Sequence, residues 1–277
     1  MHDAIWRTEL LPLIAERVWR DDFQASEVGD LVRRFVETKS WEADFPEAVL
    51  AAAELDGLLE WGDSLASQLR AAREEFPRHR LVCGADLSLG LPGRSAILEL
   101  EIDGRKIVVS QRISCALAPT SETDSVILLQ CTKVKGFVKN PSTVDSSKAF
   151  GARLQAAVLD LAGIGHPVRI RFFAREPNIK PADETGWTVD RLWLETVLGD
   201  LLRNECQFLP AKPVLDAKPK DLTLLAVREK IEGSDYSDAL QELFDPSLPG
   251  EDENDDEALL ALARRRLGPF LEANRGA

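Results

Sequence analysis

The stretch LELEIDGRKIVVSQRISCALAPTSETDSVILLQCTKVKG (98–136) decides the fold of this 277-residue chain. Apolar and polar residues alternate at its start, break at Asp103-Gly104 and resume at Ile107. Alternation on both sides of an Asp-Gly pair is typical of a tight β-hairpin. A polar loop follows, and the short apolar run VILLQCT (126–132) then leads into basic and glycine residues. This run predicts a buried strand that emerges into a loop.

A helix and one more strand follow. In SSKAFGARLQAAVLDLAG (146–163), apolar residues recur at intervals of three and four, and the segment ends on Gly163, which is typical of a helix and its end. The segment VRIRFFA (168–174) then has the composition of a strand. The order hairpin, strand, helix, strand predicts an α/β fold with a mixed sheet flanked by helices.

This order, with these local sequences, resembles the PD-(D/E)XK (restriction-endonuclease-like) nuclease domain at the C-terminus of the RecB, AddB and RecC helicase-nuclease family. The resemblance covers roughly residues 80 to 215. It implies a PD-(D/E)XK core, here with helical N- and C-terminal extensions, and a role in DNA repair and recombination. The chain is most like the RecC type, the gamma subunit of exodeoxyribonuclease V, whose nuclease-like domain does not cleave.

The residues that hold the metal in this family are replaced here. The family's second strand reads approximately GRIDR, with the aspartate as a metal ligand, and the register QRIS (111–114) puts Ser114 in its place. The third strand reads approximately VDYKTG, with an acid and then a lysine, and Gln130 and Thr132 stand at those positions. The resemblance therefore implies a vestigial site at Ser114, Gln130 and Thr132.

Two further segments carry the resemblance. The family's next helix contains a glutamine in a pattern like LQLxxY, and ARLQAAVLDLAG (152–163) supplies Gln155 without the final tyrosine. Upstream, GADLSLGLPG (84–93) resembles the strand that precedes the hairpin in AddB-like domains.

The replaced residues remove the chemistry of a metal-dependent nuclease. Magnesium prefers oxygen ligands and is usually held by one or two carboxylates, whereas serine and glutamine carry no compensating charge. Thr132 cannot supply the positive charge of the motif's lysine, and Lys133 points to the opposite face of a strand. We expect no confident catalytic residue, no bound metal and no cofactor. An active Mg-dependent DNA exonuclease is the alternative, with Asp86, Glu99 or Glu101 as relocated ligands.

The charge is unevenly distributed. The net charge of −13 argues against autonomous DNA binding, because Lys and Arg supply most non-specific affinity for phosphates. Between Thr132 and Arg175, however, eight basic residues stand against two acids. The sequence offers two interpretations of this stretch, a DNA-binding face or the exposed basic sides of ordinary elements. The DNA-binding candidates are Lys133, Lys135, Lys139, Lys148, Arg153, Arg169 and Arg171.

Three regions are expected along the chain. Residues 1–78 form a helical region that packs on the core, with apolar residues at helical spacing in 8–19, 26–38 and 45–76. Four of its residues are tryptophans (6, 19, 41 and 61), which serve either as core anchors or as a partner-binding surface. Residues 79–215 form the nuclease-like core, in which 188–204 is a further amphipathic helix.

Residues 216–277 form an acidic linker and C-terminal helices. Six of the seven residues in 251–257 are acids, and they precede an expected helix at 257–267. Acids at the start of that helix and Arg264–Arg266 at its end would both favour the helix dipole. Such a run is typical of a solvated spacer, and a segment that mimics DNA or docks a basic partner is the second interpretation.

Composition and motifs narrow the function classes. No apolar run reaches the length of a membrane span, and the charged N-terminus is unlike a signal peptide, so a cytoplasmic protein is expected. The four cysteines (83, 115, 131 and 206) are widely spaced and suggest neither a zinc site nor a disulfide framework. The phosphate loop GxxxxGK[ST] of a helicase motor is absent from the sequence.

The leading hypothesis is a non-catalytic, nuclease-like component of a RecBCD- or AddAB-like helicase-nuclease complex in double-strand-break repair. Its partners would be a helicase-nuclease subunit and, through the complex, DNA. Its roles would be subunit docking and guidance of a DNA strand. The active exonuclease is one alternative, and a protein-binding adaptor unrelated to DNA is the other.

Overall fold

The structure is a computed structural model. It describes residues 2–40, 48–132, 134–135, 143–144, 146–174, 179–185, 189–202 and 253–272. These residues divide into two compact units. The sheet unit comprises Met1–Leu98, Val109–Val144 and Ala152–Thr188, and the hairpin unit comprises Glu99–Val108, Asp145–Gly151 and Val189–Ala277.

A mixed five-stranded sheet forms the centre of the sheet unit. Its spatial order is β1 (His79–Ala85), β4 (Ile113–Pro119), β5 (Val126–Thr132), β8 (Val168–Ala174) and β9 (Ala182–Thr185). Neighbouring strands are antiparallel except β5 and β8, which are parallel. A parallel pair needs a long crossover, and helix α4 (Ser146–Leu161) lies between these two strands in the chain. Nearly continuous burial along β5 and β8 agrees with their covered, central position.

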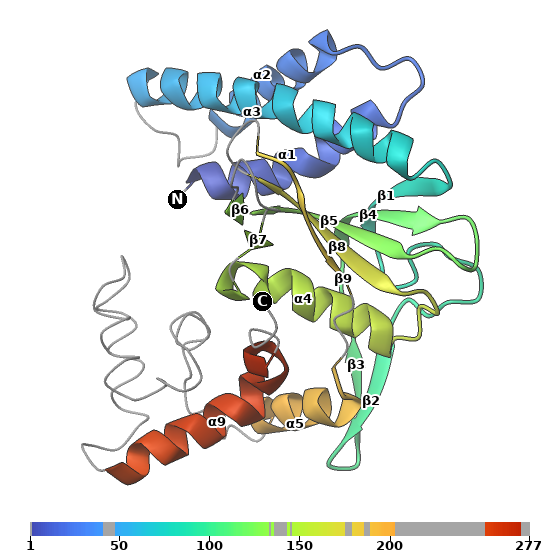
Figure 1. The fold of residues 1–277 in the computed structure, drawn as a ribbon, viewed down its shortest axis with the longest axis vertical. Coiled ribbons are helices and arrows are strands. Elements are labelled where there is room, and N and C mark those ends of the chain that lie inside the picture. The colour runs from blue at the N-terminus through green and yellow to red at the C-terminus, as the bar shows by residue number, and fades with distance from the viewer. Residues whose placement is uncertain are drawn as a thin grey trace. The chain divides into compact units, whose positions relative to one another are not determined.

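Helices cover both faces of this sheet (Figure 1). The first three helices, α1 (His2–Val18), α2 (Ser26–Ser40) and α3 (Ala48–Glu75), lie on one face, and residues 152–161 of α4 lie on the other. Apolar residues of the three helices share one buried cluster with Leu117, Leu129 and Phe173 of the sheet. The described parts of these three helices therefore pack on the sheet.

Trp61 of α3 anchors this packing. Its side chain is 1% exposed, and its indole N–H donates to the carbonyl oxygen of Ala174 at 2.9 Å. Trp19 is partly buried against the same cluster. For Trp61 the core interpretation is confirmed. The side chain of Trp6 and all of Trp41 lie outside the described residues.

The predicted turn at Asp103-Gly104 is confirmed. Strands β2 (Leu98–Ile102) and β3 (Arg105–Val109) pair into a separate two-stranded sheet. Asp103 and Gly104 have φ angles of 51° and 71°, as a two-residue turn with both central residues left-handed requires. The second arm is shorter than the alternation suggested. It ends at Val109, and β4 pairs with β1 instead, so Ser114 lies outside the hairpin.

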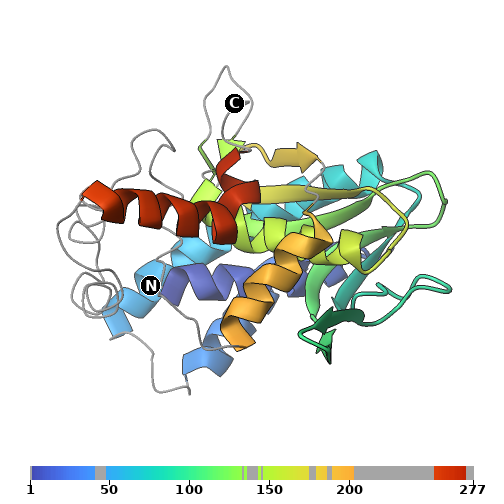
Figure 2. The same cartoon turned by 90° about the horizontal axis from the view of Figure 1, so that it is seen from below.

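The hairpin unit also contains two helices, α5 (Arg191–Leu202) and α9 (Glu253–Glu272), which contact each other (Figure 2). The buried carboxylate of Asp200 pairs with Arg265 at 2.8 Å and with Arg266 at 3.5 Å. The helix predicted at 257–267 is longer at both ends, so these arginines lie in mid-helix. Their observed role is an ion pair with α5 rather than a favourable position at a helix end.

The general expectation of an α/β fold with a mixed sheet flanked by helices is therefore met. A second pair of short strands, β6 (Val134–Lys135) and β7 (Thr143–Val144), follows β5. The predicted boundaries at residues 78 and 215 stay predictions, and the expected linker at 216–252 lies outside the described residues. Within the described residues, none of the helices combines the length and apolarity that crossing a membrane requires.

Candidate functional site

The positions predicted to form a vestigial site come together on one face of the central sheet. Strands β4 and β5 pair through Ala116 and Leu128, and the same register continued by two residues brings Ser114 opposite Gln130. Thr132 lies two residues beyond Gln130 and is therefore on the same face. The odd-numbered neighbours face the other way, into the cluster shared with α1 to α3.

Helix α4 packs on this face and contributes Gln155, which the resemblance also singled out. The side-chain amide of Gln130 donates from Nε2 to Oε1 of Gln155 at 3.0 Å. Gln155 in turn donates from Nε2 to the carbonyl oxygen of Arg112 at 3.5 Å, a long hydrogen bond. Gln155 is only 7% exposed, so these bonds satisfy a largely buried amide. We call Ser114, Gln130 and Gln155, together with the backbone carbonyl of Arg112, the amide centre.

A positive charge lies beside the amide centre. Arg112 is exposed, and its Nε donates to the carbonyl oxygen of Gly84 at 3.2 Å. Gly84 falls opposite Ser114 in the register of β1 and β4 and has φ of 63°. The positive φ favours glycine at this position, and a Cβ atom there would lie 2.9 Å from Nη2 of Arg112, so the end of that flexible side chain would have to shift. Within the described residues, Arg112 has no carboxylate partner.

This arrangement is unsuited to a divalent cation. The hydrogen bond between the two glutamines occupies one amide hydrogen of Gln130 and the side-chain oxygen of Gln155, and neither side chain carries a negative charge. Thr132 is 6% exposed and neutral. The nearby guanidinium of Arg112 repels a cation and attracts an anion. The amide centre can therefore hold strands and helix together and can offer donors to an anion.

The alternative metal ligands belong to different units of the structure. Asp86, in the sheet unit, is exposed and accepts the backbone N–H of Ser88 at 2.9 Å, a turn-capping role. Glu99 and Glu101 are exposed residues of β2 in the hairpin unit, and Glu99 pairs with Lys106 at 2.7 Å. Among the described residues, no three His, Cys, Asp or Glu side chains gather in a way that could hold a metal.

Two of the proposed DNA-binding arginines are neutralised within the fold. Arg153 is buried and pairs with Glu184 of β9 at 2.8 Å. Arg171 is buried and pairs with Glu75 of α3 at 2.8 Å and with Asp183 of β9 at 2.6 Å. Burial lowers the pKa of Arg171, but the bonds to these two carboxylates outweigh it and raise the pKa above its ordinary value. These charges hold elements together and are not displayed to a nucleic acid.

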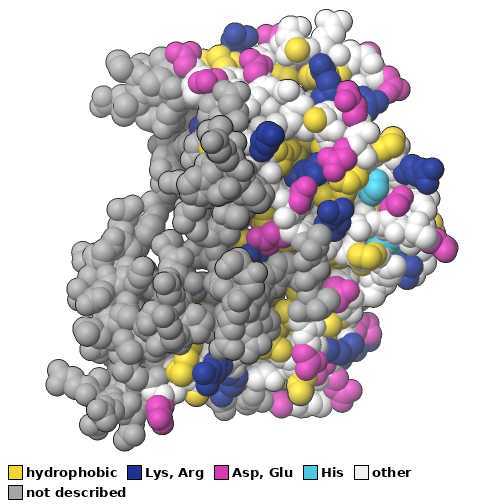
Figure 3. Space-filling view, in the orientation of Figure 1, with side chains coloured by type: hydrophobic (Ala, Val, Ile, Leu, Met, Phe, Trp, Pro, Cys, Tyr) yellow, Lys and Arg dark blue, Asp and Glu magenta, His cyan; other side chains and the backbone are white. Residues whose placement is uncertain are grey.

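The rest of the basic stretch is only partly described. Arg169 of β8 is half-buried. Lys135 and Lys148 belong to β6 and α4, but their side chains lie outside the described part, as do Lys133 and Lys139 entirely. On the face seen in Figure 3, basic and acidic side chains of the described residues are intermingled rather than gathered by sign. The described residues therefore provide no broad basic surface on this face.

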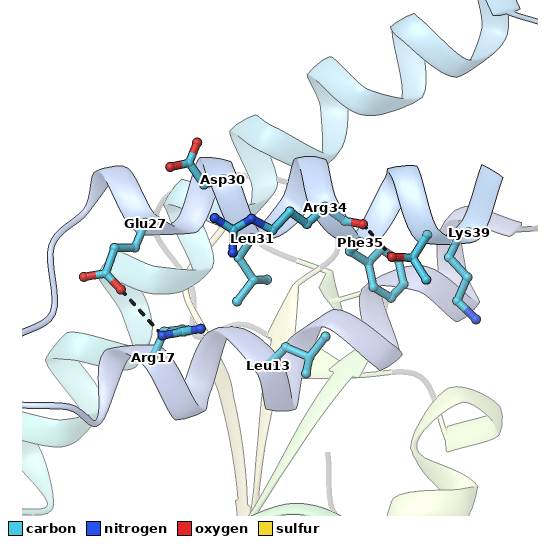
Figure 4. Close-up of a pocket in the computed structure, with 9 residues that line it drawn as sticks. Leu13, Arg17, Glu27, Asp30, Leu31, Arg34, Phe35 and Lys39 are labelled. Carbon is cyan, nitrogen blue, oxygen red and sulfur yellow. Dashed lines mark hydrogen bonds and ion pairs between the residues drawn. The ribbon is translucent and has the colours of Figure 1, made fainter. Parts of the chain in front are cut away.

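A groove of about 510 Å³ lies between α1 and α2 (Figure 4). Leu13, which is 39% exposed, and Phe35 form part of its wall. Its charged rim is partly paired, since Arg17 lies 3.9 Å from Glu27. The groove is shallow and mixed in character, and nothing in it points to a particular ligand.

Sequence reasoning missed Arg112 as well as the carboxylates that neutralise the basic stretch. Arg112 is two residues before Ser114, and its proximity to the vestigial position was a usable signal. The carboxylates Glu75, Asp183 and Glu184 come from α3 and β9, so only the fold brings them to the arginines.

Comparisons of the chain with protein-family models, with curated proteins and with solved structures found no match.

Proposed function

We propose that the chain is a non-catalytic, nuclease-like component of a RecBCD- or AddAB-like helicase-nuclease complex, and that its main role is subunit docking. The observation that carries the proposal is the hydrogen bond between Gln130 and Gln155. It joins two positions that the resemblance assigns to the centre of a PD-(D/E)XK site. A neutral amide pair there stabilises the fold and leaves no carboxylate for magnesium.

The order of elements supports the same proposal. Three antiparallel strands, β1, β4 and β5, are followed by helix α4 and by the parallel strand β8. Ser114, Gln130 and Thr132 share the face covered by that helix. The positions that the resemblance assigns to the nuclease site thus lie on one face of the sheet, as expected for an active site that has lost its catalytic residues.

Docking is favoured over DNA guidance by the buried ion pairs. Arg153 and Arg171, two of the seven DNA-binding candidates, are paired with carboxylates. The net charge of −13 also weighs against phosphate contacts. Arg112 at the amide centre is exposed and has no carboxylate partner among the described residues, so it is the candidate for such a contact.

The first experiment is cleavage of end-labelled single- and double-stranded DNA by the purified chain with Mg²⁺ and with Mn²⁺. We expect no cleavage above that of heat-inactivated protein. Cleavage that is abolished by Asp86→Ala or Glu101→Ala would overturn the non-catalytic proposal and establish a relocated metal site.

A substitution that restores charge tests the assignment of the eroded site. The Ser114→Asp, Gln130→Glu double variant should acquire Mn²⁺ binding measurable by titration calorimetry, because two carboxylates would then face each other across β4 and β5. Ser114→Asp alone is the matched control and should bind more weakly. A folded double variant without any Mn²⁺ binding would count against the assignment.

The proposed guidance of a DNA strand depends on Arg112. Arg112→Gln should weaken single-stranded DNA binding, measured by fluorescence anisotropy, and reduce the salt slope of the affinity by about one. Arg80→Gln is the matched control, because Arg80 is also exposed and donates to a backbone carbonyl, that of Leu89, at 2.6 Å. Equal effects of both substitutions would remove the guidance role and leave docking.

The partner is tested by purifying the tagged chain from the cells that produce it. We expect a stoichiometric subunit whose sequence contains the GxxxxGK[ST] phosphate loop of a helicase. Elution of the chain alone, or with partners that have no link to DNA, would favour the adaptor hypothesis instead.

A further inference from the structure

Two cysteines face each other across neighbouring strands of the central sheet. Cys83 of β1 and Cys115 of β4 are direct partners in the antiparallel register. Their Sγ atoms are 3.7 Å apart. Directly opposite residues in an antiparallel pair have Cα atoms about 4.5 to 5.5 Å apart, within the range of about 4.4 to 6.8 Å that disulfides use. Small side-chain rotations would bring the sulfurs to bonding distance without moving the strands.

The two thiols differ in access. Cys115 is fully buried, whereas Cys83 is only half-buried. Sγ of Cys83 also lies 3.9 Å from the carbonyl oxygen of Pro12 in α1, and its single S–H can donate to only one of the two neighbours. The contact with Cys83 and burial both raise the pKa of Cys115 well above its usual value. Cys83 is therefore the thiol that an external reagent meets first.

We propose that Cys83 and Cys115 are a reversible oxidation site that closes to a disulfide when the chain meets a low-molecular-weight disulfide. In the first step, the Cys83 thiolate attacks one sulfur of the small disulfide, forms a mixed disulfide and releases one small thiolate. In the second step, Cys115 loses its proton, attacks the Cys83 sulfur and releases the second small thiolate. Two protein thiols are oxidised, the small disulfide is reduced to two thiols, and the two cysteine protons pass to the released thiolates.

A disulfide between Cys83 and Cys115 would restrict the movement of β4 beside the amide centre. Cys115 directly follows Ser114, and Cys83 directly precedes Gly84, which Arg112 covers. The bond would also tie edge strand β1 to β4 across 32 residues of sequence. A cross-link of that span restricts the unfolded chain and so stabilises the fold. Disulfides in reducing compartments are usually transient and regulatory, which suits a reversible site.

Cys131 provides a matched control on the same sheet. It is buried on β5 and belongs to the same buried cluster as Cys115. Strands β4 and β5 pair Ala116 with Leu128, so Cys131 lies two residues away from the position on β5 that faces Cys115. It is therefore not the direct partner of Cys115, and its removal should leave the proposed bond intact.

The test uses the full chain, oxidised glutathione as the small disulfide, and mass mapping of peptides after thiols are blocked. We expect a peptide pair joined through Cys83 and Cys115 that dithiothreitol reverses, formed equally by Cys131→Ser and not by Cys83→Ser. The oxidised chain should melt about 5 °C or more above the reduced chain, and Cys83→Ser should lose that difference.

Several outcomes would overturn the proposal. One is a folded chain that keeps both thiols while the urea-unfolded chain is oxidised under the same conditions. Another is a reaction that stops at a mixed disulfide on Cys83. A third is pairing of either cysteine with Cys131 or Cys206. Because Cys83 is half-buried, Cys83→Ser should fold, and near-ultraviolet circular dichroism checks that it does.

Discussion

Arg153 of α4 donates two parallel hydrogen bonds to Glu184 of β9, from Nε to Oε2 at 2.9 Å and from Nη2 to Oε1 at 2.8 Å. The pair is mostly buried, with side-chain exposures of 8% and 19%. It connects the helix that carries Gln155 to the edge strand of the sheet. The same arginine that the sequence suggested for DNA binding thus holds α4 in place.

Removing one partner of this pair should be costly. Glu184→Ala leaves the buried guanidinium without its carboxylate and should lower the free energy of unfolding by about 3 kcal/mol, measured by urea denaturation. The double variant Arg153→Met, Glu184→Leu removes both charges and should recover most of that loss. A double variant no more stable than Glu184→Ala would show that the charge pair is not the source of the effect.

The indole of Trp61 should be sensitive to loss of its N–H. Trp61→Phe removes the donor to Ala174 and leaves a small cavity, so the free energy of unfolding should fall by about 2 to 3 kcal/mol. Trp19→Phe is the matched control, since Trp19 is only partly buried, and should cost less than about 1 kcal/mol. Circular dichroism avoids the loss of fluorescence that either substitution causes. Equal losses would argue against the hydrogen bond.

Local patterns in the sequence identified most elements. The hairpin turn, strand 168–174 and helix 146–161 follow from alternation, glycine positions and helical spacing, which depend only on neighbouring residues. The end of β3 at Val109 could not be predicted in this way. The apolar alternation continues past it into β4, and the change of partner from β2 to β1 is a tertiary effect.

In the candidate site, too, some features could be predicted from the sequence and others could not. The sequence placed Ser114, Gln130 and Gln155 at motif positions, and the shared face of Gln130 and Thr132 follows from the period of two in a strand. The register of β4 and β5 that brings Ser114 to the same face is a property of the fold. The ion pair of Arg171 with Glu75 could not be predicted, because Glu75 is 96 residues away in sequence. Charge counts along a segment therefore misjudged which arginines are exposed, since ion pairs form between distant elements.

A glycine in α3 allows close approach of α2. A Cβ at Gly62 would lie 3.2 Å from Cγ2 of Val32 and 3.3 Å from Cγ1 of Val28, and both valines are buried and stiff at χ1. Gly62→Ala should therefore destabilise the fold by about 1 to 2 kcal/mol. Gly57 in the same helix has open space, so Gly57→Ala should stabilise by about 0.5 to 1 kcal/mol. Thermal unfolding of the two variants checks the opposite signs, and equal signs would contradict the close packing.

The Cys115 thiol should make stability depend on pH in alkaline solution. Its contact with Cys83 and its burial raise its pKa in the folded state, so the folded chain keeps this proton at a pH where the unfolded chain has lost it. Stability supplied by the neutral thiol is then fully present below about pH 8.5, the ordinary cysteine pKa, and falls as the pH rises above it. The slope contributed by this group can reach about 1.4 kcal/mol per pH unit. Urea unfolding of the reduced chain at pH 7 to 10 should show this decline.

Cys115→Ala isolates the contribution of that thiol from other groups that titrate in the same range. The variant should be less stable than the parent at pH 7, because a buried sulfur is lost, but its stability should fall less steeply above pH 8.5. The difference between the two curves should therefore shrink with rising pH. Parallel curves would mean that Cys115 keeps the same pKa in both states. In that case the contact with Cys83 does not favour the protonated thiol.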